Sequence, residues 1–192
     1  MRTKTIYFYL MLTVASSCVE NNTYQEKLKD PALYNAAMKQ LTEVIVHDIF
    51  SPPVASRVYA YPNIAAYEIM AQAFPDKFIS LSGQLTDFTS IPKNDDPQVN
   101  VYLAALHAFL TVGTELIFSE DKMQAFQDQT YQALQADGLS KRGLNSSMRY
   151  GDQVAVHILK WADRDHYKQT RTDAKYTIRA QPEYWKPTPP DY

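Results

Sequence analysis

Residues 101–110 are apolar at almost every position, and this run limits the choice of fold more than any other segment. A helix with the sequence VYLAALHAFL is apolar around its whole circumference instead of along one stripe. Such a helix is stable in water only when other helices surround it. We therefore expect a helix over residues 97–118, opened by Asp95, Asp96 and Pro97, at the centre of a helical bundle.

Four further segments carry apolar residues at helical spacing. Asp30 and Pro31 supply a cap and a first-turn proline for one helix, and Gly138 is a typical helix stop. Pro62 lies inside another helical pattern and is expected to kink or split it. The segments are residues 31–49, 53–72, 140–164 and the stretch between Ser119, expected as an N-cap, and Gly138.

No strand has comparable support in the sequence, and residues 75–94 read as a long polar loop. We predict an all-α fold, a helical bundle of about five main helices with a nearly buried central helix. The bundle should cover residues 30–181 and form part of a larger α-helical domain. Residues 182–192 are proline-rich, so we expect an extended tail that leads to a missing second half.

The first 17 residues have the pattern of an export signal. Arg2 and Lys4 precede an apolar run at residues 6–14, and small residues lead into Cys18. The run is about half of the roughly 20 residues needed to span a bilayer. We therefore expect residues 1–17 to be a cleaved signal peptide. The alternative is an ordinary signal peptide in which the cysteine is incidental.

The sequence Ala-Ser-Ser-Cys at residues 15–18 resembles the lipobox of bacterial lipoproteins. That resemblance implies cleavage before Cys18 and lipid attachment to this residue, which makes a membrane the first expected partner. Residues 18–29 would then be a lipid-anchored tether. The expected location is the cell envelope, with the exported protein lipid-anchored on the periplasmic side or the outer surface.

Composition excludes several other classes of function. Loss of Arg2 and Lys4 with the signal changes the formal net charge from −2 to −4, so no basic face for nucleic acid is expected. Cys18 is the only cysteine, which excludes intrachain disulfides and cysteine-rich metal sites. The five glycines form neither a dinucleotide-binding fingerprint nor a phosphate-binding loop.

Few residues are candidates for chemistry, and each has a stronger structural interpretation. Residues 163–166 could begin a calcium loop, but the residues after them do not supply the ligands that such a loop needs. We therefore interpret this segment as a solvated helix end. His47 suits a helix end through the macrodipole. His107 and His157 read as hydrogen-bonded histidines, and Arg57 as a partly buried cation in a salt bridge. We assign no catalytic, cofactor-binding or metal-ligating residue, and only Cys18 as a site of lipid attachment.

Three segments carry a resemblance to a known superfamily. They are the Pro-Pro-x-Ala-x-Arg pattern at residues 52–57, the helix that contains residues 151–165, and Trp-x-Pro-Thr-Pro-Pro at residues 185–190. Together they resemble the amino-terminal half of secreted vanadium-dependent haloperoxidase-like proteins. Their superfamily also contains the type-2 phosphatidic acid phosphatases.

The resemblance implies a helical bundle in a chain about twice this long. The second half would hold vanadate or phosphate with one lysine, two arginines and two histidines, through charge-assisted hydrogen bonds. The motifs that supply these residues are a lysine followed by Arg-Pro, a Pro-Ser-Gly-His and a Ser-Arg followed by histidine. Arg-Pro and Pro-Ser-Gly-His do not occur in the chain, and the single Ser-Arg, at residues 56–57, has Asn63 where the histidine is expected.

Our leading hypothesis is a scaffold region of a lipid-anchored haloperoxidase- or acid-phosphatase-like enzyme, catalytically silent by itself. Its partner would be the missing carboxy-terminal half or a separate catalytic subunit, and vanadate would be a cofactor of the full-length protein only. The alternative is a complete, non-enzymatic, surface-anchored helical binding module. The sequence does not distinguish phosphatase from haloperoxidase chemistry, because both use the same oxyanion cradle.

Overall fold

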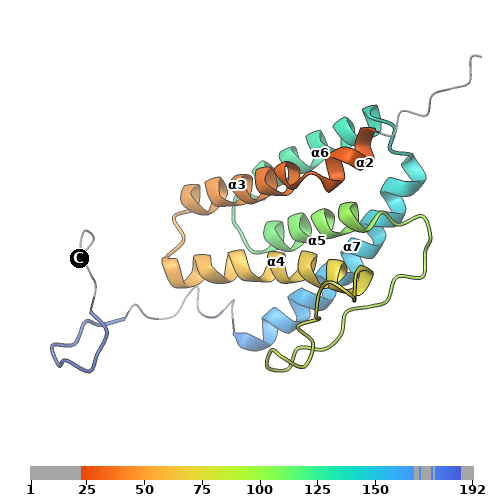
Figure 1. Ribbon diagram of the computed structural model, residues 1–192. Helices are drawn as coiled ribbons and strands as arrows, with labels where there is room; N and C mark the ends of the chain where they lie inside the picture. The colour runs from red at the N-terminus through yellow and green to blue at the C-terminus, as the bar shows by residue number, and fades with distance from the viewer. Residues whose placement is uncertain (1–22, 167–168, 170–173, 175, 187–192) are drawn as a thin grey trace, which may run out of the picture.

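The computed structural model describes residues 23–166, 169, 174 and 176–186 (Figure 1). The described residues contain helices and no strand, which confirms the all-α prediction. The elements are α2 (Thr23–Lys29), α3 (Pro31–His47), α4 (Pro52–Ala73), α5 (Val101–Glu115), α6 (Glu120–Ala136), α7 (Lys141–Ala162) and the short 3₁₀ helix η1 (Asp163–Asp165). Among the described helices, none is both long enough and apolar enough to cross a membrane.

Helix α5 is the centre of the bundle, as its apolar sequence predicts. Figure 1 shows α5 between α4 on one side and the pair α3 and α6 on the other, with α7 crossing the stack. Ten of the 15 residues of α5 are buried, and the helix contacts α2, α3, α4, α6 and α7. Phe109 and Leu110 are fully buried, and each such side chain contributes roughly 1.5–3 kcal/mol to folding.

Helix α5 begins later than predicted because a different residue caps it. Asn100 Oδ1 accepts hydrogen bonds from the backbone N–H groups of Tyr102 (3.1 Å) and Leu103 (3.2 Å). Asp96 instead accepts from Gln98 N–H at 2.9 Å and belongs to the preceding turn. The expected opening at residues 95–97 is therefore part of the loop.

Helix α4 is continuous through Pro62, so the expected split does not occur. Pro62 is buried in the interface with α5, where a Cβ added at Gly113 would lie 3.8 Å from its Cγ. Proline removes one helical hydrogen bond. Packing against the central helix offsets that loss and keeps the two halves of α4 in one element.

The seven residues of α2 differ from the tether expected over residues 18–29. Leu28 is buried, the backbone N–H of Tyr24 donates to Asp137 O at 3.3 Å, and Lys27 forms an ion pair with the Asp137 carboxylate. Helix α2 is thus docked on the end of α6, so residues 23–29 are helical and in contact with the bundle.

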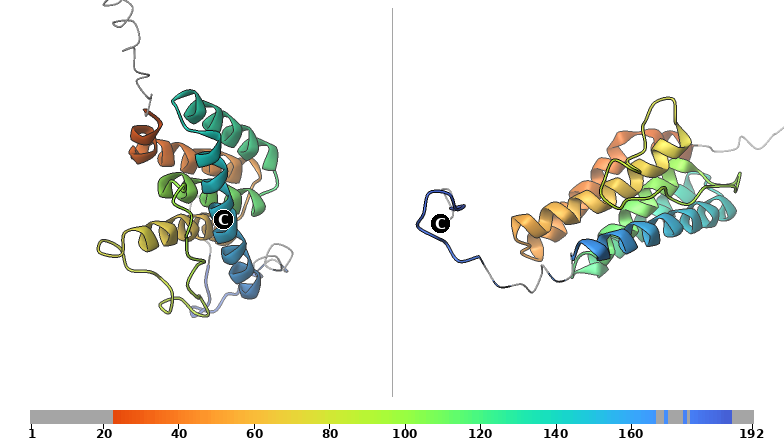
Figure 2. Two further views of the ribbon diagram at one scale, coloured as in Figure 1. Left: turned by 90° about the vertical axis from the view of Figure 1, so that its right-hand side faces the viewer. Right: turned by 90° about the horizontal axis from the view of Figure 1, so that it is seen from below.

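The long connection at residues 74–100 extends away from α4 and returns along one side of α7 before it reaches α5 (Figure 2). Side chains of α7 and η1 donate hydrogen bonds to three carbonyl groups of one short loop segment. They are His157 Nε2 to Thr89 O (3.0 Å), Trp161 Nε1 to Thr86 O (3.0 Å) and Arg164 Nη2 to Asp87 O (2.7 Å). These bonds fix the loop along the outer side of α7.

The described part of the expected extended tail turns back on itself. Tyr184 N–H donates to Gln181 O at 3.3 Å, and the Tyr176 ring packs edge-on against Trp185 with 5.6 Å between ring centroids. Trp185 is still 65% exposed. The proline-rich residues 187–192 lie outside the described residues.

Candidate functional site

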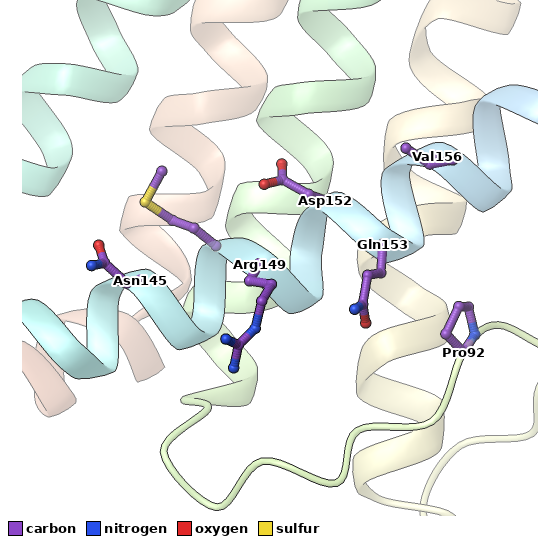
Figure 3. A pocket seen from close by; sticks show the side chains of 7 residues that line it. Pro92, Asn145, Arg149, Asp152, Gln153 and Val156 are labelled. Carbon is purple, nitrogen blue, oxygen red and sulfur yellow. The ribbon is translucent and has the colours of Figure 1, made fainter.

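A wide groove of about 650 Å³ runs along the exposed face of α7 (Figure 3). Residues at helical spacing on α7 form its floor, and Pro92 of the long loop borders it. The lining residues are Pro92, Asn145, Met148, Arg149, Asp152, Gln153 and Val156. Because they belong mostly to one helix face, the groove is shallow and open to solvent.

Arg149 is the cation of this groove, and an acid already neutralises it. Its Nη2 atom donates to Asp96 Oδ2 at 2.6 Å. Hydrogen bonds from the backbone of Gln98 and the side chain of Ser146, together with the charges of Arg149 and Arg142, lower the pKa of Asp96 below its ordinary value. Asp96 is therefore ionised at neutral pH and holds Arg149 as an ion pair.

The residues of the groove do not fit vanadate. A tetrahedral oxyanion requires several uncompensated donors, as a lysine and two arginines would supply. Here Arg149 is paired with Asp96, and the Asp152 carboxylate adds a negative charge to the groove wall. In the described part of the chain, no group of three or more histidine, cysteine, aspartate or glutamate side chains could hold a metal ion.

Asp152 connects the groove to a buried histidine beneath it. His107, on α5, is 2% exposed, and its Nε2 lies 2.8 Å from Asp152 Oδ1. Its Nδ1 lies 2.5 Å from the hydroxyl of Tyr131 on α6. Two weaker contacts, each of 3.4 Å, come from Thr111 and Gln127.

This arrangement suits an imidazole held in one orientation. The Nε2–H group donates a hydrogen bond to the Asp152 carboxylate, and the Nδ1 lone pair accepts a hydrogen bond from the Tyr131 hydroxyl. Both ring nitrogens are therefore occupied, and burial keeps the ring away from solvent. Burial also raises the pKa of Tyr131, so its hydroxyl stays protonated and donates. His107 joins α5, α6 and α7, which confirms the prediction of a hydrogen-bonded core histidine.

Gly151 allows α5 and α7 to approach closely at this point. A Cβ at residue 151 would lie 2.8 Å from His107 Cδ2 and 2.9 Å from the carbonyl oxygen of Ala104. Both distances are shorter than a carbon side chain tolerates. The glycine therefore sets the spacing that brings Asp152 within hydrogen-bonding distance of His107.

Arg57 lies at the other end of the bundle and has the carboxylate partner that the sequence predicts. Its Nε atom is 3.7 Å from Asp165 Oδ2, and its side chain is 34% exposed. The Tyr61 hydroxyl donates to the same carboxylate oxygen. These contacts join the first turns of α4 to the end of α7, so Arg57 is part of a salt bridge that connects the two elements.

The remaining candidates also have structural surroundings. His47 is exposed at the end of α3. His157 is partly buried, with its ring 6.0 Å from that of Phe88. In residues 163–166, Asp165 is held by Arg57, and His166 follows in a left-handed conformation with φ of 61°. Cys18, the expected site of lipid attachment, lies outside the described residues.

Glu68 and Gln72 organise the loop, and sequence reasoning did not identify either. Glu68 is 2% exposed and accepts hydrogen bonds from Ser80 Oγ (2.6 Å) and Leu81 N–H (2.7 Å). Gln72 donates from Nε2 to Pro92 O and accepts at Oε1 from Asn94 N–H, both at 3.1 Å. A polar residue within the mostly small and apolar α4 was the signal that could have indicated Glu68.

Comparison with known proteins finds a solved structure that is similar to this chain. No family profile matches the chain, and no curated protein matches it. The solved structure described as the crystal structure of the first bacterial vanadium-dependent iodoperoxidase is similar to this chain, with a TM-score of 0.72 and 45% sequence identity. The match covers 84% of this chain and 39% of the iodoperoxidase chain, so this chain spans well under half the length of that relative.

Identity at this level over most of the chain goes beyond a chance likeness of helical bundles. On this combination of sequence and shape, the chain has a vanadium haloperoxidase-like fold.

Proposed function

We propose that this chain is the amino-terminal scaffold of a longer, lipid-anchored enzyme of the vanadium haloperoxidase superfamily. The observation that carries the proposal is the 45% identity to a bacterial vanadium-dependent iodoperoxidase over 84% of this chain but only 39% of the relative. The vanadate-binding residues would then belong to polypeptide outside these 192 residues.

The chemistry of the groove supports this division of roles. Arg149 is paired with Asp96, Asp152 is negative, and both nitrogens of His107 are occupied. These residues offer neither an oxyanion cradle nor a free nucleophile. The scaffold would contribute the buried helix α5 and the helices around it, as a rigid support for the catalytic part.

The test compares this chain with the longer product of the same reading frame. Both are incubated with orthovanadate, hydrogen peroxide and iodide, and iodide oxidation is followed. We expect turnover by the longer chain and none by residues 1–192. Phosphomonoester hydrolysis without vanadate is measured in parallel, since phosphate and vanadate occupy the same kind of cradle. Turnover by residues 1–192 alone would contradict catalytic silence.

Lipid anchoring through Cys18 is a separate part of the proposal. It is supported by the Ala-Ser-Ser-Cys sequence that ends the export signal. Mass spectrometry of the membrane fraction should find diacylglycerol and an acyl chain on Cys18, and Cys18→Ser should abolish both. An unmodified mature amino terminus in the wild type would contradict the anchor.

One observation favours a self-contained binding module as the second candidate. Among the described residues, every buried side-chain nitrogen and oxygen atom has a hydrogen-bond partner, so the bundle satisfies its own polar groups. A stop codon after Tyr192, with a monodisperse and cooperatively melting product, would support this candidate over the scaffold.

A further inference from the structure

A second cavity, of about 420 Å³, lies where α2, α3, α4 and α5 meet. In Figure 1 the line of α2 and α3 runs above α5 and α4, and all four helices contribute to the cavity wall. It is more enclosed than the groove on α7 and shares no lining residue with it. We call it the tyrosine cavity, because Tyr34, Tyr67 and Tyr102 line it.

The wall of the tyrosine cavity is rich in aromatic rings. Phe78, from the turn after α4, joins the three tyrosines. The rings of Tyr67 and Phe78 meet edge-on with 6.1 Å between centroids, and the Tyr34 ring packs against Phe109 of α5 at 5.0 Å. These contacts hold the rings in place. Ring faces and edges of this kind attract a further aromatic ring, in addition to removing it from water.

Small residues on α4 and α5 provide the space. Ala66 is 4% exposed and Ala105 5%, and both line the cavity from adjacent helices. Met70, one turn after Ala66 on α4, adds a flexible thioether that adapts to a ligand and contacts aromatic rings favourably. Cavities of roughly 300–1,000 Å³ with mostly apolar walls and a few polar groups are typical sites for small molecules.

The polar groups of Tyr34 and Tyr67 already use their protons. The Tyr34 hydroxyl donates to Asn63 Oδ1 and the Tyr67 hydroxyl to Ile79 O, each at 2.8 Å. Burial raises the pKa of Tyr34, so its hydroxyl stays protonated. The amide group of Asn63 donates to atoms of α3 and α4. These side chains therefore offer oxygen lone pairs, which suit a ligand that brings an O–H or N–H donor.

The tyrosine cavity carries no net charge. Lys29 and Asp30 are adjacent and exposed at its edge, and Asp30 Oδ1 already accepts from Ala32 N–H at 2.8 Å. The Tyr102 hydroxyl has no hydrogen-bond partner among the described residues, so it can donate to a ligand or accept from one. A charged ligand would lose its hydration here without meeting a net opposite charge.

We propose that the tyrosine cavity binds a neutral aromatic molecule that carries a hydroxyl or N–H donor, of the phenol or indole type. The aromatic wall, the absence of net charge and the oxygen lone pairs each select one property of this ligand. Binding here does not depend on the proposed function, because no residue of the α7 groove takes part.

The test is a titration of the full 192-residue chain, labelled at its methionine methyl groups, with phenol. The methyl resonances report the position of the ligand, because an aromatic ring shifts the signals of nearby groups. We expect a saturable shift at Met70, which lines the cavity, and none at Met148, which lines the α7 groove. Met70→Leu identifies the resonance. No shift at Met70, or a larger shift at Met148, would overturn the proposal.

Three further ligands test the selected properties one at a time. Anisole lacks the donor and should bind about three- to tenfold more weakly than phenol, as expected for one neutral hydrogen bond. Benzoate adds a negative charge and cyclohexanol removes the aromatic ring, and both should also bind more weakly. Anisole, benzoate or cyclohexanol binding as tightly as phenol would assign the cavity to another class of ligand and overturn the proposal.

Tyr34→Phe locates the hydrogen bond, with Tyr59→Phe as the matched control. The first change removes an acceptor from the wall, so it should weaken phenol about three- to tenfold and leave anisole unchanged. Tyr59 lies outside the cavity, where its hydroxyl donates to Thr42 Oγ1 at 3.1 Å, so its variant should bind both ligands as wild type does. An equal loss for phenol and anisole in Tyr34→Phe would show a structural role only and overturn the proposal.

The same titration of the longer reading-frame product separates this inference from the proposed function. We expect the Met70 shift to persist there. Its loss would show that other polypeptide fills the tyrosine cavity and would overturn the inference. Vanadate-dependent iodide oxidation by the longer chain tests the proposed function independently, so either result can fail without the other.

Discussion

His107 Nε2 lies 2.8 Å from Asp152 Oδ1, and this contact joins the central helix of the bundle to the open groove on α7. This distance is typical of the histidine–carboxylate pairs found in many active sites, but the surroundings of the imidazole differ from those of a catalytic histidine. The second imidazole nitrogen is occupied by the Tyr131 hydroxyl at 2.5 Å. The triad therefore stabilises the packing of α5, α6 and α7.

Tyr131→Phe tests the structural role of this cluster. The substitution removes the donor to His107 Nδ1 and leaves a buried nitrogen without its best partner, which should cost about 1–3 kcal/mol of unfolding free energy. Urea unfolding followed by circular dichroism measures the change. Tyr176→Phe is the control because Tyr176 is 51% exposed and contacts Trp185. Equal stability of the two variants would contradict a stabilising cluster.

Gly151→Ala should push α5 and α7 apart. The new methyl group would lie 2.8 Å from His107 Cδ2 and 2.9 Å from Ala104 O, and overpacking of this kind typically costs 1–3 kcal/mol, roughly. Gly113→Ala is a matched helix-interior control, since its nearest neighbour would be Leu41 at an ordinary 3.4 Å. We expect that control to be neutral or to gain up to about 1 kcal/mol from helix propensity. Thermal melts of both variants distinguish the two cases.

Glu68→Gln should loosen the long loop. The carboxylate accepts from Ser80 Oγ and Leu81 N–H, and an amide can offer only one acceptor oxygen to these two donors. We expect a loss of about 1–3 kcal/mol and faster hydrogen exchange at residues 80–82. Glu43→Gln changes an exposed carboxylate that pairs with Lys39 and should cost under about 0.5 kcal/mol. Unchanged exchange in the Glu68 variant would show that the loop is held by other contacts.

Asp48 should make the bundle sensitive to acid. Partial burial opposes its ionisation, but hydrogen bonds from the side chain and backbone of Ser119 and from the backbone of Phe118, with the charge of His47, prevail and lower its pKa. A lowered pKa stabilises the fold fully above the ordinary value of about 3.9 and ceases to do so as pH falls through the folded-state pKa.

The variant that checks this is Asp48→Asn. We expect it to be less stable than wild type at pH 7, with a difference that shrinks as the pH falls from the ordinary aspartate value of about 3.9 through the lower folded-state pKa of Asp48. Asp76→Asn, at an exposed position in the turn after α4, is the control and should show no such convergence. Urea midpoints at a series of pH values give the comparison. A stability difference that does not change with pH would show that the charge of Asp48 does not contribute to stability.

The sequence predicted the helices well because each has a strong local signal. The apolar run of α5 specified its central place, and Asp30 caps α3 with a 2.8 Å hydrogen bond from Ala32 N–H, as expected. Gly138 ends the α6 segment with φ of 102°. These features depend on residues close in sequence, which is why pattern reasoning could identify them.

The differences arise where a distant residue decides the outcome. Ser119 was expected to cap α6, but its hydroxyl donates to Asp48, 71 positions away in the chain. His107 was expected to be hydrogen-bonded, but its carboxylate partner, Asp152 on α7, is 45 positions away in the chain. Residues 23–29 were expected to be part of a tether, because the ion pair of Lys27 with Asp137 spans 110 positions of the chain. Such pairings become visible only when the helices are placed in space.

The docking of α2 on α6 also determines how far the bundle could stand from a lipid bilayer. Four residues, 19–22, separate Cys18 from the first described helical residue, Thr23. Five extended peptide steps reach at most about 18 Å. An acyl group on Cys18 would therefore hold the start of α2 within about 18 Å of the membrane surface.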